Sequence, residues 1–411
     1  MPAELSDHGP VDSSPEKVAA LDGLRGVAIL LVVCVHVGDV TGVVRYEKFV
    51  WRLLGTGTIG VPIFFILSGF LLYRPFARAT LNGTALPGVR GYLRRRAFRV
   101  LPAYWLVLPV AVRMCDDPRA ERPLVWLELI TLTHPYDPDR WWEGTSLLAF
   151  WSLSVEVCFY LLLPLLAWGA HRTCRGSARR LLIVMSGLAV ASVAWTGTLR
   201  YVAEIPVIFY NEPLLPRSLV HFALGAALAV SAERPGPAAS RIAASPGLGW
   251  VIALCGLALL STPLTTPLSG PQSAHQYLVG TFLIPLAALA AVAPAALAPA
   301  RDFNRFLLGN LLVAGLGRIS YGIFLWHIPV LIAWYRLSGR PMFAGDFWTV
   351  LSVVLGVSTV LGALSRDLVE QPFQRLGRRW GKRTEAPDKY RCEQTGDGKA
   401  VPDGRSARRA Q

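Results

Sequence analysis

The chain has few charged side chains for its length. Only 17% of its 411 residues are Asp, Glu, Lys or Arg, whereas 53% are hydrophobic, and a soluble domain has about 25% charged residues. The missing charge leaves long apolar stretches, of which 277–298 and 347–364 are the clearest. Each is close to the roughly 17–25 residues that a helix needs to cross a bilayer. The shortage of charge therefore argues against a soluble helical core and predicts an all-α integral membrane protein.

Paired cysteines and a leader segment are also missing. Six cysteines are scattered along the chain without a CxxC pair, which argues against a disulfide framework and a zinc site, so we expect no metal. The first twenty residues are polar and acidic and contain three prolines, so they lack the basic-then-apolar order of a signal peptide. We expect residues 1–20 to remain in the protein as a cytoplasmic segment.

Acidic residues are outnumbered by basic ones, and the net charge is +14. In a soluble protein such a charge would suggest nucleic acid, but here the arginines gather between apolar stretches, so we expect no nucleic acid partner. The apolar stretches give about ten candidate transmembrane helices. They lie near 26–44, 59–74, 98–113, 147–168, 181–199, 214–231, 248–261, 277–298, 311–336 and 346–366. Alternate connections are rich in arginine, and the connection 262–276 has none. The positive-inside rule therefore predicts that both termini are cytoplasmic.

The domain organisation is simple. Residues 21–375 are expected to form one membrane domain, and no internal repeat is visible. Segment 124–132 is apolar but too short to span, so we expect a re-entrant or interfacial piece. Residues 381–411 are polar with few large apolar side chains, and this composition predicts a disordered cytoplasmic tail.

Three ionisable side chains fall inside predicted spans. His36 lies ten residues beyond Gly26, which is about 15 Å along a helix and near the middle of the bilayer. Glu156 and His327 are expected at similar depths. A charge at the centre of a span costs about 2.5–3.5 kcal/mol to insert. Each group could be a structural bridge between helices, but three at similar depth predict one shared polar cavity.

Arginines and a serine accompany these groups. Arg25 lies eleven residues before His36, at the cytoplasmic end of the same predicted helix. Arg96 and Arg99 are three residues apart and share a helix face. Paired guanidinium groups suit phosphate, such as the phosphates of coenzyme A, although simple anchoring at the membrane edge is the alternative. Ser68 belongs to a Ser-Gly pair, which in membrane helices often serves close packing.

Five motifs occur in a fixed order along the chain. They are LDGLRGVAILLVVCVH, GVPIFFILSGFLL, RRRAFRVLPAYW, FWSLSVEVCFYLLLPLL and ISYGIFLWHIPV. Together they resemble the acyltransferase-3 family of membrane acyltransferases over roughly residues 18–375. The sequence departs from the family at Val157 and Cys158, where relatives carry a polar pair.

The resemblance implies specific roles for residues of these motifs. The implied catalytic residues are His36, Arg25, Glu156 and His327. The implied coenzyme A ligands are Arg96 and Arg99, and the implied substrate contacts are Ser68, Trp151, Ser154 and Tyr321.

The resemblance also implies a function. It is the transfer of an acyl group, acetyl or another short one, from acyl-CoA as co-substrate to a hydroxyl of a sugar, without a permanently bound cofactor. The acceptor would be a surface glycan or a glycosylated natural product such as a macrolide, and the protein would be a multi-pass protein of the bacterial cytoplasmic membrane. A transporter or lipid-linked sugar flippase would also place charges at mid-membrane, and a membrane scaffold is a third alternative. The lack of hydropathy symmetry between the two halves argues against a transporter.

Overall fold

The computed structural model describes residues 15–45, 48–137, 142, 145–201, 214–265, 272–298 and 302–384, and all regular structure within them is helical. The helices of the first half are α1 (Pro15–Thr41), α2 (Phe49–Gly55), α3 (Gly60–Asn82), α4 (Val89–Arg113), α5 (Pro123–Ile130), α6 (Phe150–Cys174) and α7 (Ala178–Tyr201). Those of the second half are α9 (Leu215–Glu233), α10 (Pro237–Ala244), α11 (Pro246–Leu260), α12 (Ala274–Leu297), α13 (Asp302–Leu308), α14 (Leu311–Arg318), α15 (Ser320–Ser338), α16 (Phe347–Ser365) and α17 (Gln371–Thr384). Short 3-10 turns lie at Val43–Arg45, Thr56–Ile59, Pro118–Glu121 and His134–Tyr136, and a π-turn at Arg366–Glu370 joins α16 to α17.

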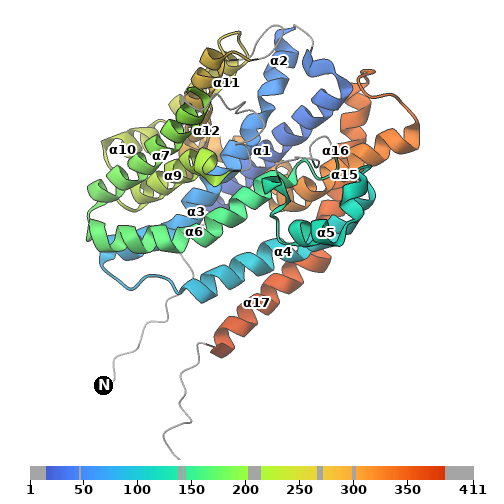
Figure 1. Cartoon of the computed structure of the whole chain (residues 1–411). Coiled ribbons are helices and arrows are strands. Elements are labelled where there is room, and N and C mark those ends of the chain that lie inside the picture. Colours follow the sequence, from blue (N-terminus) through green and yellow to red (C-terminus); the bar gives the residue numbers. More distant parts are fainter. Residues whose placement is uncertain are drawn as a thin grey trace, which may run out of the picture.

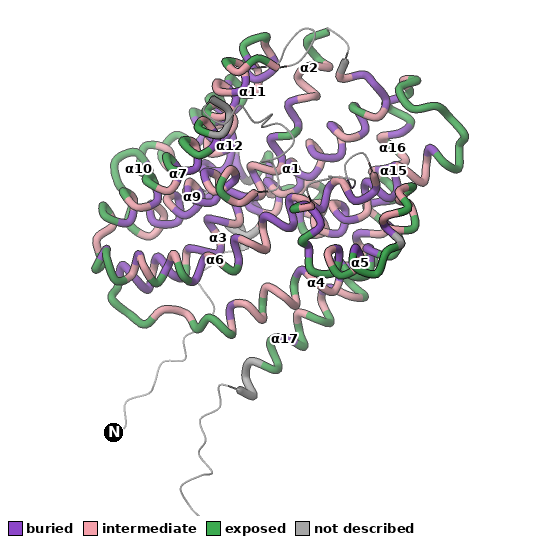
Figure 2. Tube along the Cα trace, in the orientation of Figure 1, coloured by how far each residue is buried: buried purple, intermediate pink, exposed green. Residues whose placement is uncertain are grey.

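The prediction of an all-α membrane protein is confirmed. Among the described residues, seven helices are long and apolar enough to cross a membrane, and nine spans result if each of two bent pairs counts as one. Large apolar side chains such as Leu161, Val190 and Leu254 are more than 60% exposed on the outside of the bundle, as expected where a surface faces lipid instead of water. Figure 2 shows that buried residues concentrate along α1, α3 and α9.

One of the ten predicted spans is not among these nine. Segment 98–113 belongs to α4, whose apolar stretch is bounded by Arg96, Arg99 and Arg113, so the helix is too polar to qualify as a span by composition. The basic end of α4 lies beside α17 (Figure 1), and the rings of Phe98 and Phe373 lie 6.5 Å apart. The orientation of the chain, with both termini cytoplasmic, stays a prediction.

One predicted span is broken, because α14 and α15 meet at Ile319 with a bend of 74°. The predicted span 248–261 corresponds to α11, and the bend of 93° between α10 and α11 precedes it. The sequence predicted one continuous helix over 311–336, but Gly315 and Gly317 weaken the helix just before the bend. The break makes Ser320 the first residue of α15.

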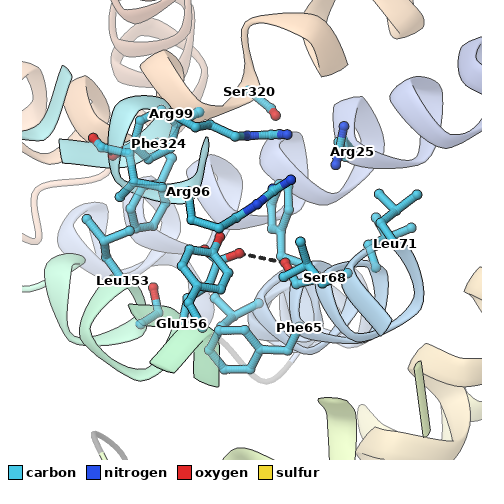
Figure 3. A pocket seen from close by; sticks show the side chains of 18 residues that line it. Arg25, Phe65, Ser68, Leu71, Arg96, Arg99, Leu153, Glu156, Ser320 and Phe324 are labelled. Carbon is cyan, nitrogen blue, oxygen red and sulfur yellow. Dashed lines mark hydrogen bonds between the residues drawn. The ribbon is translucent and has the colours of Figure 1, made fainter. Parts of the chain in front are cut away.

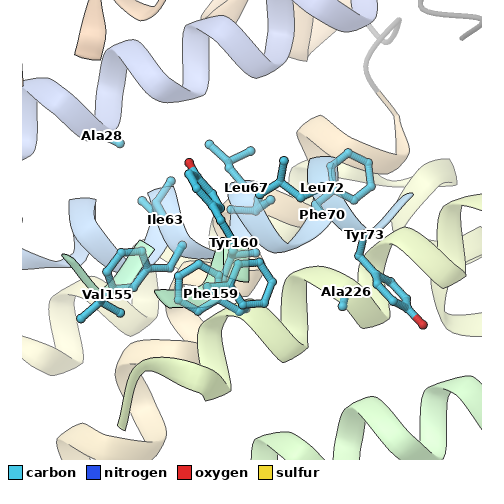
Figure 4. Packing of buried hydrophobic residues seen from close by; sticks show 14 of the residues in the cluster. Ala28, Ile63, Leu67, Phe70, Leu72, Tyr73, Val155, Phe159, Tyr160 and Ala226 are labelled. Carbon is cyan, nitrogen blue, oxygen red and sulfur yellow. The ribbon is translucent and has the colours of Figure 1, made fainter. Parts of the chain in front are cut away.

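α3 and α9 cross closely beside the site. A Cβ atom added at Gly69 would lie 2.3 Å from the carbonyl oxygen of Phe222, and one at Gly225 would lie 2.1 Å from that of Ile66. The two backbones therefore touch, and only glycine fits at either position, as in close-packed membrane helices. Figure 4 shows buried side chains of α3, α6 and α9 packed at this crossing. At its end, Glu233 of α9 pairs with Arg74 of α3 at 2.6 Å.

The predicted domain boundaries can be compared with the first and last described helices. α1 begins at Pro15, inside the predicted N-terminal segment, and residues 1–14 lie outside the described residues. α17 continues to Thr384, so residues 381–384 of the predicted tail are helical, and 385–411 lie outside the described residues. The short apolar segment near 124–132 forms α5, which is too short to span.

Candidate active site

The first of two neighbouring cavities is rich in arginine. It has a volume of about 310 Å³ and lies where α1, α3, α4, α6 and α15 meet. Its polar lining consists of Arg25, Ser68, Arg96, Arg99, Ser152, Glu156, Tyr160, Ser320 and Tyr321. Figure 3 shows the side chains of Arg25, Arg96 and Arg99 pointing into the same space. We call this space the arginine cavity.

Positive charge exceeds negative charge in the arginine cavity. Three guanidinium groups and one carboxylate, that of Glu156, line it. Arg25 also pairs with Asp22 on its own helix at 3.3 Å, whereas the buried Nε of Arg96 has no hydrogen-bond partner within the described part of the chain. Buried charges without partners are costly. A bound anion would relieve this cost, and planar guanidinium groups offer paired donors to a phosphate.

Glu156 is held by a serine of the opposite helix. The hydroxyl of Ser68 on α3 donates a hydrogen bond of 2.6 Å to the Glu156 carboxylate on α6, drawn as a dashed line in Figure 3. Ser68 is therefore a polar contact, not only a packing residue. The Arg217 guanidinium lies over the ring of Tyr277 at 5.7 Å and lines the other cavity.

The second cavity is larger and lies among α1, α3, α6, α7, α9 and α12. Its volume is about 660 Å³. Its polar lining includes His36, Asp39, Thr58, Trp151, Thr196, Arg217, Ser218, His221, Gln272, Tyr277 and Thr281. We call it the histidine cavity. Two side chains of α3, Val61 and Phe65, line both cavities.

The expected single polar cavity is thus divided into two. Glu156 lines the arginine cavity, whereas His36 lines the histidine cavity. α1 passes along both, because Arg25 belongs to the first and His36 to the second. The eleven residues between them correspond to about 16 Å along the helix axis. The two spaces adjoin at Val61 and Phe65.

His36 and His327 form a contact pair with defined roles for their nitrogens. Nδ1 of His36 lies 2.8 Å from the carbonyl of Val32, and Nδ1 of His327 lies 2.6 Å from the carbonyl of Phe324. A carbonyl only accepts, so each Nδ1 carries the proton in the neutral ring. Nε2 of His327 lies 3.4 Å from Nδ1 of His36. In the tautomer that donates to Val32, Nε2 of His36 is the unprotonated nitrogen of a residue that lines the histidine cavity.

The other predicted site residues have different surroundings. Trp151 lines the histidine cavity. Tyr321 lines the arginine cavity, and its hydroxyl donates to the carbonyl of Val100 at 2.8 Å. Ser154 is buried and donates at 3.3 Å to Phe150 of its own helix. His327 is fully buried behind His36. The structure therefore brings all predicted residues except Ser154 to one of the cavities or to their wall.

Sequence reasoning missed several polar residues of the histidine cavity. Asp39 follows His36 by three residues, so the two share a helix face, and this spacing was visible in the sequence. Arg217 and His221 lie four residues apart within the apolar span 214–231, which is the pattern of ionisable groups turned toward a bundle interior. Nε2 of His221 is buried without a hydrogen-bond partner among the described residues.

Comparisons with known proteins show which family the chain resembles. The model of a family described as "Acyltransferase domain" matches residues 18–366. The chain is 28% identical to a putative peptidoglycan O-acetyltransferase of Bacillus subtilis, with 88% of the chain and 55% of the relative covered. It is 23% identical to the O-acetyltransferase OatA of Staphylococcus aureus, with 89% and 58% covered. It is also 28% identical to the acyltransferase MdmB of Streptomyces mycarofaciens, with 90% and 95% covered.

The coverage differs between these relatives. The chain spans little more than half the length of the two O-acetyltransferases, but almost the full length of the Streptomyces protein. No solved structure matches the chain.

Proposed function

Because this chain belongs to the acyltransferase domain family whose model covers residues 18–366, we propose that it transfers an acyl group from acyl-CoA to a hydroxyl of a sugar. One observation carries the proposal: a cavity lined by three arginines adjoins a cavity lined by a histidine whose Nδ1 lies 2.8 Å from a backbone carbonyl. The first suits the phosphates of the donor. The second supplies the base that the acceptor hydroxyl requires.

The donor would bind with its phosphates in the arginine cavity. Arg96 and Arg99 lie one helical turn apart on α4 and can hold neighbouring phosphates, and Arg25 adds a third guanidinium from α1. Coenzyme A carries its phosphates and its thiol at opposite ends of a long arm. The distance of about 16 Å along α1 between Arg25 and His36 suits such an extended molecule.

The chemical step would use His36 as the general base. Nε2 of His36 takes the proton of the acceptor hydroxyl as the hydroxyl oxygen attacks the thioester carbonyl carbon. A C–O bond forms, the C–S bond breaks, and the coenzyme A sulfur leaves as a thiolate. The imidazolium of His36 then gives the proton to that sulfur, so the products are an ester and free coenzyme A. Histidine returns to its starting state without any added oxidant or reductant.

His327 would act as a positioning residue for His36. Its Nε2 lies 3.4 Å from Nδ1 of His36, and the carbonyl of Val32 lies 2.8 Å from the same nitrogen. The carbonyl would keep the proton on Nδ1, and the ring of His327 would hold the orientation of the His36 ring. In this respect they would do what a carboxylate does for the histidine of a hydrolase triad.

The acceptor would occupy the histidine cavity. That cavity has twice the volume of the arginine cavity and combines hydroxyl, amide and acidic side chains with the ring of Trp151, a lining that suits a sugar. Two relatives are named as O-acetyltransferases, and one of these names specifies peptidoglycan, which supports a surface glycan as acceptor. The almost full-length match to the Streptomyces acyltransferase keeps a glycosylated natural product such as a macrolide as an equal candidate. Membership of an acyltransferase family argues against a transporter.

The proposal is tested with the purified protein in lipid nanodiscs. Labelled acetyl-CoA is supplied together with a panel of peptidoglycan fragments, other glycans and macrolides, and the labelled ester and free coenzyme A are measured. We expect label in at least one acceptor and an equal amount of released coenzyme A. If coenzyme A neither binds nor is released with any acceptor, the proposal is wrong.

A further inference from the structure

The wall between the two cavities consists of a short segment of α3. Val61 and Phe65 line both cavities and lie four residues apart, so they face the same side of the helix. Phe65 is 3% exposed and borders both cavities. A group that moves from one cavity to the other on this side of α3 passes these two side chains.

Phe65 is held by aromatic neighbours on three sides. Its ring stacks on Phe222 at 4.7 Å, meets Trp151 edge-on at 6.5 Å, and lies 6.3 Å from His221. Phe222 in turn stacks on Phe159 at 4.0 Å. Trp151 and His221 line the histidine cavity, whereas Phe222 lines neither cavity. Phe65 is therefore the member of this cluster that separates the two spaces.

The backbone of this segment is fixed at both ends. A Cβ atom added at Gly60 would lie 2.5 Å from the carbonyl oxygen of Ala28 on α1, and Gly69 touches α9 in the same way. α3 is thus clamped between α1 and α9, one contact on each side of the segment 61–68. Because the backbone cannot retreat without separating two close-packed helices, the width of the passage depends on the side chains at 61 and 65.

From these contacts we infer that Val61 and Phe65 enclose the acyl group during transfer and that Phe65 sets the largest acyl group accepted. The inference rests on the proposed function. The thioester carbon must be reached by the acceptor oxygen that His36 activates from the histidine cavity, while the phosphates remain in the arginine cavity. The acyl chain beyond that carbon then lies against the Phe65 ring. An acetyl group ends there, whereas a longer chain collides with the ring.

The test compares two donors on three variants. The rate of coenzyme A release, as kcat/KM, is measured for acetyl-CoA and for butyryl-CoA with one acceptor, and the ratio of the two is the readout. Phe65→Leu widens the passage and should raise the butyryl-to-acetyl ratio by roughly tenfold or more, because one methylene in an apolar pocket changes selectivity by about 10–200-fold. Val61→Phe narrows it and should lower the ratio.

Phe222→Leu is the matched control. It removes an aromatic ring that stacks on Phe65 but lines neither cavity, so its ratio should change less than that of Phe65→Leu. A Phe65→Leu ratio equal to that of the wild type would overturn the inference while the enzyme assignment stands. Wild-type protein that releases coenzyme A from neither donor would instead overturn the proposed function. If Phe65→Leu is not recovered folded, an unchanged ratio in Val61→Phe overturns the inference by itself.

Discussion

The two cavities differ in charge and in size, and the smaller one carries the stronger charge. The arginine cavity, about 310 Å³, has three guanidinium groups and one carboxylate, whereas the histidine cavity, about 660 Å³, has a mixed polar and aromatic lining. A fixed pattern of charge suits a co-substrate whose phosphates never change. A roomy surface of hydroxyl, amide and ring groups suits an acceptor that differs between members of a family. The difference separates donor recognition from acceptor recognition, and variants can test that separation.

The largest effect is expected for His36→Ala. Loss of a general base typically costs about 10²–10⁴-fold in rate, so acyl transfer should fall by that factor. Coenzyme A affinity should stay unchanged, because His36 lines the other cavity. Transfer of labelled acetyl groups and titration calorimetry with coenzyme A measure the two quantities. Activity within threefold of wild type would remove His36 from the catalytic role.

A large effect on binding is expected for the Arg96→Ala/Arg99→Ala double variant. Hydrogen bonds to charged groups contribute about 1.5–3 kcal/mol each, so the Kd for coenzyme A should rise by roughly 100-fold or more. Arg99→Lys keeps the charge but loses the planar fork, so it should be impaired as well. Titration calorimetry with coenzyme A measures both variants. Unchanged affinity in the double variant would leave these arginines an anchoring role only.

The smallest effect is expected for Ser68→Ala. It removes the 2.6 Å hydrogen bond to Glu156, and a net contribution of about 0.5–1.5 kcal/mol corresponds to roughly 2–10-fold. The change should appear in the KM for acetyl-CoA, because both residues line the arginine cavity. Ser154→Ala is the control, since its hydroxyl bonds only within its own helix and lines neither cavity. Equal kinetics in the two variants would contradict a role for Ser68.

Much of the fold could be predicted because a helix in lipid needs an uninterrupted apolar run. The arginines at the edge of 98–113 show the limit of that reasoning, since a run of the right length no longer qualifies by composition when charges bound it closely. The bend at Ile319 was not predicted, because helix propensity changes only gradually along the sequence. The bend depends instead on how α14 and α15 pack in the folded bundle. Membrane orientation is a statement about lipid and loops, so the helices alone do not test it.

The sequence predicts which residues belong to the candidate site, but not how these residues are distributed between the two cavities. Sequence position gives the depth of a residue in the membrane, and it placed His36 and Glu156 at similar depth. Depth says nothing about which neighbours a helix face meets, so the sequence could not tell that Phe65 stands between the two cavities. The contact between His36 and His327 joins residues 291 positions apart, and only the assembled bundle reveals it.

The glycine contact between α3 and α9 has a consequence for how the donor preference of such a protein can change. With the backbones in contact at Gly69 and Gly225, the helix framework cannot be re-spaced by small steps, because each step would break a contact that only glycine allows. New donor preferences must then arise by exchange of side chains on a fixed scaffold. A designer who wants a different ester should therefore build a library at positions 61 and 65 and leave the glycines untouched.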